Sequence, residues 1–260
     1  MAVDKTWLFI PAKERFLKNI EKQSADYIIL ELEDSLAEHQ KDEGLRLTTE
    51  ILQKYGKEKK IFVRINSGER QQQEVTELCK QEFAGIMFPK FEDVCVLEQY
   101  KQTLKGKEVI ALIETIKGIF DLKQIAAYPM ITRLAFGGED FCKEISFEAG
   151  EEATLFARNQ LVMYAAFNQK YSLDGVCLEV KNMNVFQESY FKTKRMGFSG
   201  KLLIHPNQVQ AVQEYGRKTD REYLKYIVKV FENSGEGAML IDGEFYDKPV
   251  IDKIINYLKQ

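Results

Sequence analysis

Cysteine and histidine are scarce in this 260-residue sequence, which limits the kinds of site it can hold. The four cysteines are scattered and show no C-x-x-C spacing, at Cys79, Cys95, Cys142 and Cys177. This pattern favours free thiols in a reducing compartment over a disulfide framework or a zinc site. Residues 1–5 also lack the basic and apolar regions of a signal peptide, so we expect a cytoplasmic protein.

Long apolar runs and an excess of charge of one sign are also missing. No window approaches the length of a membrane span. The 37 basic and 40 acidic residues leave a formal net charge of −3, which gives no electrostatic basis for binding nucleic acid. We therefore expect neither a membrane nor a nucleic-acid partner. The 45% hydrophobic and 30% charged residues are typical of a soluble globular protein.

The sequence instead alternates short apolar runs with amphipathic segments. Each run has the length of a strand buried on both faces of a parallel sheet, and each amphipathic segment has apolar residues at helical spacing. About eight runs occur, at residues 7–11, 27–30, 61–63, 85–88, 109–113, 134–136, 173–176 and 201–204. This repetition predicts an α/β fold, a (β/α)8 TIM barrel over residues 1–217. An open doubly wound sheet is the alternative, but no G-x-G-x-x-G follows the first strand.

The pattern changes in residues 218–260. An apolar stripe at helical spacing covers residues 223–231, and Asp242-Gly243 is a strong hairpin signal. Pro249 then opens a last helix. These features predict a helix–hairpin–helix extension that packs on the closed barrel or on a neighbouring subunit.

Two of the predicted strands end in carboxylates. The run at residues 109–113 leads into Glu114, and the run at 134–136 leads through two glycines into Glu139 and Asp140. An unpaired carboxylate is costly to bury in apolar surroundings, so Glu114 and Asp140 should emerge at the same rim of the barrel. Carboxylates without a histidine or cysteine companion suit a hard cation, Mg²⁺ or Mn²⁺.

Other strand ends add charges of both signs to this rim. Glu33, Asp34 and Lys90 are candidates for substrate binding. Arg64 is a further candidate, because its guanidinium can donate two parallel hydrogen bonds to a carboxylate. A metal with an arginine can hold an oxo-acid and stabilise an enolate. Each residue also has a structural interpretation: the acids as helix caps or salt-bridge partners, Arg64 and Lys90 as rim ion pairs, and His205 as a structural hydrogen-bonding residue.

These charged positions lie within sequence motifs that occur in order along nearly the whole chain. They are L-F-I-P at 8–11, L-E-D-S at 32–35, V-R-I-N at 63–66, M-F-P-K at 87–90, I-E-T at 113–115, G-G-E-D at 137–140, L-F-A-R at 155–158, G-F-S-G-K at 197–201, I-H-P-N-Q at 204–208 and D-G-E-F-Y-D-K-P at 242–249. In these motifs the chain resembles the citrate lyase beta subunit group of the HpcH/HpaI aldolase superfamily.

The resemblance implies a TIM barrel that binds Mg²⁺ at Glu114 and Asp140 and contacts the substrate carboxylate through Arg64. It implies cleavage of a carbon–carbon bond in a 3-hydroxyacyl thioester of the citryl, citramalyl or malyl type. The carrier would be coenzyme A or an acyl carrier protein, and the products an acetyl thioester and an oxo-acid. It also implies that Asp247 reaches the active site of a neighbour within a trimer, where it is our candidate acid/base.

Two alternatives to this lyase stay open. One is a free oxo-acid aldolase or an acyl-CoA thioesterase on the same barrel. The other is a subunit or non-catalytic protein that is active only within a lyase complex.

The chain departs from the family pattern at three places near the expected site. Ala12 stands where the family commonly has glycine, and Leu45 stands where it often has arginine. Residues 141–145 read F-C-K-E-I rather than the family's L-x-x-D-L. We expect these changes to alter the carrier pocket and the loop over the site.

Overall fold

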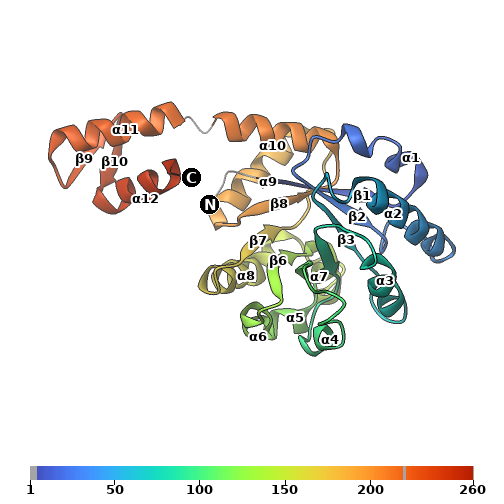
Figure 1. The fold of residues 1–260 in the computed structure, drawn as a ribbon. Coiled ribbons are helices and arrows are strands. Elements are labelled where there is room, and N and C mark those ends of the chain that lie inside the picture. Colours follow the sequence, from blue (N-terminus) through green and yellow to red (C-terminus); the bar gives the residue numbers. More distant parts are fainter. Residues whose placement is uncertain (1–4, 219–220, 260) are drawn as a thin grey trace. The chain divides into compact units, whose positions relative to one another are not determined.

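The computed structural model describes residues 5–218 and 221–259. Within them, eight parallel strands pair in chain order, and β8 pairs with β1, so that the sheet closes into a barrel (Figure 1). The strands are β1 Lys5–Pro11, β2 Tyr27–Glu31, β3 Ile61–Arg64, β4 Gly85–Phe88, β5 Glu108–Ile113, β6 Ile131–Phe136, β7 Tyr171–Asp174 and β8 Gly200–Leu203. The predicted TIM barrel is confirmed.

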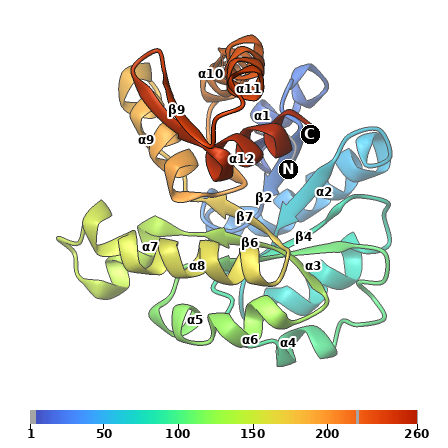
Figure 2. The same cartoon turned by 90° about the vertical axis from the view of Figure 1, so that its left-hand side faces the viewer.

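Helices connect the strands and cover the outside of the barrel. They are α1 Glu14–Leu17, α2 Lys41–Tyr55, α3 Arg70–Leu78, α4 Cys95–Glu98, α5 Ile116–Phe120, α6 Leu122–Ala127, α7 Gly138–Ile145, α8 Leu155–Phe167, α9 Met183–Met196 and α10 Pro206–Lys218, with 3₁₀ turns η1 Ile20–Lys22, η2 Glu38–Gln40 and η3 Glu151–Thr154. Figure 2 shows α8 lying along β6 and β7. None of the described helices is both long and apolar enough to cross a lipid bilayer.

The barrel interior contains an aromatic cluster that surrounds a cation. Trp7 stacks on Tyr27 with ring centroids 3.8 Å apart, and Phe62 lies 5.3 Å from Trp7. The guanidinium of Arg133, on β6, lies 5.2 Å from the Trp7 ring and pairs with Glu108. The Nε of Arg133 is buried without a hydrogen-bond partner. Ring faces attract cations, so the cluster offsets part of the cost of burying this charge.

We expect packing rather than charge to be the main contribution of Arg133 to stability. Arg133→Met fills much the same space, and Glu108 is 40% exposed, so its lost partner is replaced by water. The methionine should cost less than about 1.5 kcal/mol of unfolding free energy, whereas Arg133→Ala should cost about 3 kcal/mol through the cavity it leaves. Urea unfolding measures the free energy of unfolding of both variants. Equal losses in the methionine and alanine variants would show that the charge itself stabilises the barrel.

The chain divides into two compact units, residues 5–210 and the residues from 211 onward. The second contains α11 Arg221–Ser234, β9 Ala238–Ile241, β10 Glu244–Asp247 and α12 Lys248–Leu258, so the predicted helix–hairpin–helix is confirmed (Figures 1 and 2). Asp242 and Gly243 both have positive φ, as a tight hairpin turn requires. Ile227, Phe231, Ile241, Tyr246 and Ile251 form its core. The boundary after residue 217 stays a prediction.

Candidate functional site

A cavity of about 350 Å³ lies where the predicted rim carboxylates emerge. Five acids line it, which are Glu31, Asp34, Glu114, Glu139 and Asp140. The two cations among its lining residues are Arg64 and Lys143. The other walls are largely apolar, with Phe9, Leu112, Phe136, Val176, Leu202 and Ile204. The cavity therefore combines a strongly charged side with an apolar one.

Glu114 follows directly after β5 and is buried. Its Oε1 accepts a hydrogen bond of 2.8 Å from the backbone N–H of Lys90. The carboxylate lies against the backbone of Gly137, where a Cβ atom would come within 2.4 Å of Oε2, so this position requires glycine. Burial and the nearby charge of Glu33 raise the pKa of Glu114 to about 8. The ionised form of Glu114 therefore needs a further positive charge.

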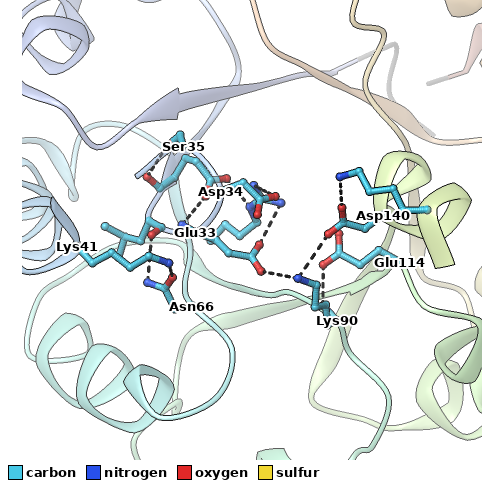
Figure 3. Close-up of polar contacts among 12 residues, drawn as sticks. Glu33, Asp34, Ser35, Lys41, Asn66, Lys90, Glu114 and Asp140 are labelled. Carbon is cyan, nitrogen blue, oxygen red and sulfur yellow. Dashed lines mark hydrogen bonds and ion pairs between the residues drawn. The ribbon is translucent and has the colours of Figure 1, made fainter. Parts of the chain in front are cut away.

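Lys90 connects three of the predicted site carboxylates. Its φ of +46° is unusual for a residue with a side chain. In this conformation its N–H meets Glu114, while its Nζ lies 3.5 Å from both Glu33 Oε1 and Asp140 Oδ2 (Figure 3). This geometry agrees with the rim ion-pair interpretation of Lys90, and a contact with substrate stays a prediction.

Asp140 lies in the first turn of α7, beside Glu114 (Figure 3). Its Oδ1 is 2.7 Å from the Nζ of Lys143, and its Oδ2 faces Lys90. The hydrogen bond from Lys143 holds the pKa of Asp140 below its usual value. Asp140 therefore stays ionised, and both of its oxygens face ammonium groups.

Arg64 ends β3 and forms ion pairs with three acids. It pairs with Glu31, with Glu33 at 3.3 Å and with Asp34 at 3.3 Å, and its guanidinium lies 5.1 Å from the ring of Phe9. Burial opposes its charge, but these carboxylates still raise the pKa of Arg64. For Glu33 burial outweighs the nearby cations and raises the pKa to about 6.

Glu31 is a site residue that the sequence analysis missed. It is the last residue of β2 and is paired in register with Arg64 on β3, so their side chains emerge together. The available signal was an acid at the end of one apolar run and an arginine at the end of the next. Because Glu33 and Asp34 follow in the same short segment, the sequence alone did not show which acid ends the strand.

The structure brings six of the seven predicted site residues together. Arg64, Glu114, Asp140 and Asp34 line the cavity, whereas Glu33, Lys90 and again Asp34 line an adjacent polar cleft of about 830 Å³. Asp247 belongs to the other unit, where its Oδ1 accepts a 3.0 Å hydrogen bond from the N–H of Val250 and caps α12. The Nδ1 of His205 accepts a hydrogen bond from the N–H of Asn207, in agreement with its structural interpretation.

The donor set fits a magnesium ion held by two protein ligands. Among the residues that the structure describes, no three acidic, histidine or cysteine side chains form a complete metal site. Mg²⁺ usually takes only one or two carboxylates and completes its octahedron with water and substrate. Glu114, whose charge is poorly compensated, and the ionised Asp140 would supply that pair. The Oε2 of Glu33 is also buried and accepts no hydrogen bond, although Arg64 Nη1 lies 3.3 Å away.

Comparison with known protein families and sequences gives a consistent set of relatives. A family model described as HpcH/HpaI aldolase/citrate lyase matches residues 5–206. A citrate lyase subunit beta-like protein of Mycobacterium tuberculosis is 28% identical over 94% of this chain and 91% of its own. A (3S)-malyl-CoA thioesterase of Cereibacter sphaeroides is 26% identical over 92% and 88%. The mitochondrial citramalyl-CoA lyase of Rattus norvegicus is 26% identical over 96% and 83%.

Solved structures share the fold over the full chain. A CitE protein from Mycobacterium tuberculosis, in complex with magnesium, acetoacetate and coenzyme A, matches with a TM-score of 0.81 and 23% identity, covering 100% of this chain and 99% of that one. A citrate lyase from Burkholderia xenovorans matches with a TM-score of 0.82 and 18% identity, covering 100% and 92%. At these identities the matches establish the architecture.

Proposed function

The chain belongs to the HpcH/HpaI aldolase/citrate lyase family, and from this premise we propose that it is a Mg²⁺-dependent carbon–carbon lyase. Its substrate would be a 3-hydroxyacyl thioester of the citryl, citramalyl or malyl type, cleaved to an acetyl thioester and an oxo-acid. The observation that carries this proposal is the meeting of Glu114, Asp140 and Arg64 in one cavity with apolar walls.

Each part of the site would have a defined task. Glu114 and Asp140 would hold the ion, which polarises the oxygens of the oxo-acid portion and offsets developing negative charge. Arg64 would bind the carboxylate of the oxo-acid at Nη2, whose partner Asp34 is exposed enough to move aside. Glu33 would fix Arg64 and is itself paired with Lys90. Glu33, Asp34 and Lys90 would contact the substrate from the adjacent cleft.

The reaction breaks the bond between the hydroxyl-bearing carbon and the carbon next to the thioester. The hydroxyl loses its proton as it becomes the carbonyl of the oxo-acid, and the electron pair of the broken bond passes to the thioester fragment. That fragment then takes up a proton to give the acetyl thioester. Arg64 would hold the oxo-acid carboxylate, and Asp247 is our candidate for the proton transfers.

Product analysis distinguishes this lyase from its alternatives. We expect the purified protein with Mg²⁺ to convert citryl-, citramalyl- or malyl-CoA to acetyl-CoA and an oxo-acid. Free coenzyme A with an intact hydroxy-acid would favour a thioesterase, the activity named for the C. sphaeroides relative. Cleavage of free hydroxy-acids alone would favour an aldolase. Activity only with an acyl carrier partner would indicate a subunit of a larger complex.

Two substitutions of Asp247 separate its proposed acid/base role from its role as the N-cap of α12. Asp247→Asn keeps an oxygen that can accept from the N–H of Val250, whereas Asp247→Ala removes the cap and should cost about 1 kcal/mol of stability. Both variants should lose about 10²–10⁴-fold in kcat. Steady-state kinetics and thermal unfolding measure the two effects, and a D247N enzyme with wild-type kcat would remove Asp247 from the mechanism.

Subunit mixing tests whether Asp247 acts across an interface, as a cytoplasmic homotrimer of this kind would require. A D247N protein has intact metal ligands, and a Glu114→Gln protein has an intact Asp247. If Asp247 reaches a neighbour's site, co-refolded mixtures of the two inactive variants should regain part of the activity. A monomeric mass in light scattering, or no recovery in verified mixed oligomers, would place Asp247 outside the neighbouring site.

A further inference from the structure

Lys143 is a cavity residue to which the proposed reaction has so far given no task. It lies in α7 one turn after Asp140, and its Nζ is 2.7 Å from Asp140 Oδ1. The side chain is 71% exposed, so apart from this ion pair it is free to change its direction. It also belongs to the segment 141–145, in which the sequence departs from the family pattern. Position 143 is unspecified in the family pattern, so the shared motif assigns no role to this lysine.

The distribution of charge in the cavity makes Lys143 the cation best able to accept a new anion. Arg64, the other lining cation, has a side chain only 12% exposed and is already paired with three carboxylates. Lys90 is shared between Glu33 and Asp140. Among the described residues, Asp140 is the one carboxylate that forms an ion pair with Lys143.

A divalent ion on Asp140 competes with Lys143 for the same carboxylate. When such an ion binds Asp140, the ammonium group of Lys143 loses its ion-pair partner. Lys143 still lines the cavity, because α7 holds it there. A second anionic group on the bound acid is then the nearest replacement. The phosphates of a coenzyme A carrier are a poorer candidate, because the pantetheine chain separates them from the reacting carbons.

We propose that Lys143 is a specificity-determining residue, which pairs with a second carboxylate and so selects a dicarboxylic oxo-acid, such as oxaloacetate, over a monocarboxylic one, such as pyruvate. This inference rests on the proposed lyase function and adds the class of its oxo-acid. Arg64 serves the carboxylate next to the carbonyl, and Lys143 serves the distal one. The corresponding thioester substrate is of the citryl type.

Binding of the two acids in the presence of Mg²⁺ tests the proposal without turnover. Isothermal titration with fresh oxaloacetate and with pyruvate should show wild type preferring the dicarboxylate by about tenfold or more. Lys143→Met should lose most of this preference while its affinity for pyruvate stays within about threefold. Lys143→Arg should retain the preference, because it keeps the charge.

Lys80→Met is the matched control. Lys80 pairs with Glu77 at 2.7 Å with the same three-residue spacing, in the turn that follows α3, and it does not line the cavity. This variant should bind both acids as wild type does. A second measurement follows the competition itself: K143M should bind Mn²⁺ several-fold more tightly than wild type, by electron paramagnetic resonance.

The outcomes separate this inference from the function on which it rests. Equal binding of the two acids by wild type, an unchanged preference in K143M, or unchanged Mn²⁺ affinity would overturn the role of Lys143 and leave the lyase proposal standing. If neither acid binds in a Mg²⁺-dependent way, both proposals fail.

Discussion

Glu114→Gln is expected to abolish Mg²⁺-dependent turnover while leaving the metal-free protein at least as stable as wild type. The change removes one of the two proposed protein ligands, so the affinity for Mg²⁺ should fall by more than about a hundredfold. The fold should tolerate it because burial and Glu33 raise the pKa of Glu114 to about 8, so the wild-type acid is mostly neutral at pH 7. Glutamine has the same shape and still offers an oxygen to the N–H of Lys90.

The raised pKa of Glu114 also determines how the stability difference between E114Q and wild type depends on pH. In the unfolded chain Glu114 ionises near its ordinary value of 4.5, and in the metal-free fold near 8. The folded state therefore binds more protons between these values, and its stability falls as the pH rises through that window. The neutral glutamine lacks this loss, so the stability advantage of E114Q should grow from pH 5 to pH 8. Mg²⁺ binding by wild type should tighten over the same range, because the ion displaces the proton.

Chemical denaturation at several pH values and titration calorimetry with Mg²⁺ measure these two effects. Glu139→Gln is the control, because it is the same substitution at an exposed residue of the same cavity. It should change Mg²⁺ affinity by less than about threefold, as expected for a solvent-exposed, screened charge that is not a ligand. Normal Mg²⁺ affinity and turnover in E114Q would exclude Glu114 as a ligand, and with it the metal site.

The barrel and its charged rim were predictable from the sequence because they follow from local patterns. Parallel strands buried on both faces must be short apolar runs, and a charge directly after such a run must emerge at the rim. This reasoning placed Glu114, Asp140 and Arg64 correctly at one cavity. The Asp242-Gly243 turn was predictable for a similar reason, since the dipeptide matches the positive φ values of a tight hairpin.

Other features depend on contacts between segments far apart in the sequence. Glu31 became recognisable only through its register with Arg64, which fixes the residue at which β2 ends. The positive φ of Lys90 and its N–H contact with Glu114 have no local sequence signal, because lysine does not favour that conformation. Arg133 directly precedes the predicted apolar run at residues 134–136, and only the structure shows that the rings of Trp7 and Phe62 enclose it inside the barrel.

Arg64→Met is expected to cost both stability and activity, and the two losses can be separated. Without the guanidinium, Glu31 and Glu33 remain buried with their charges largely unpaired, and removing one partner of a buried ion pair costs about 3–5 kcal/mol. Burial already raises the pKa of Glu33 to about 6 in the presence of Arg64, and losing that cation raises it further. The variant should therefore be closest to wild type at about pH 5 and lose more stability toward pH 8.

The double variant Glu31→Gln/Arg64→Met distinguishes a structural from a catalytic role of Arg64. It removes one charge of each sign from the closest ion pair, so it should recover much of the stability lost by the single variant. It should not recover turnover, because no other group replaces the bidentate guanidinium that binds the oxo-acid carboxylate. The value of kcat/KM should stay at least about a hundredfold below wild type. Urea unfolding and steady-state kinetics give the two quantities. If activity returns together with stability, Arg64 only holds the acids in place and another cation, Lys90 or Lys143, binds the substrate carboxylate.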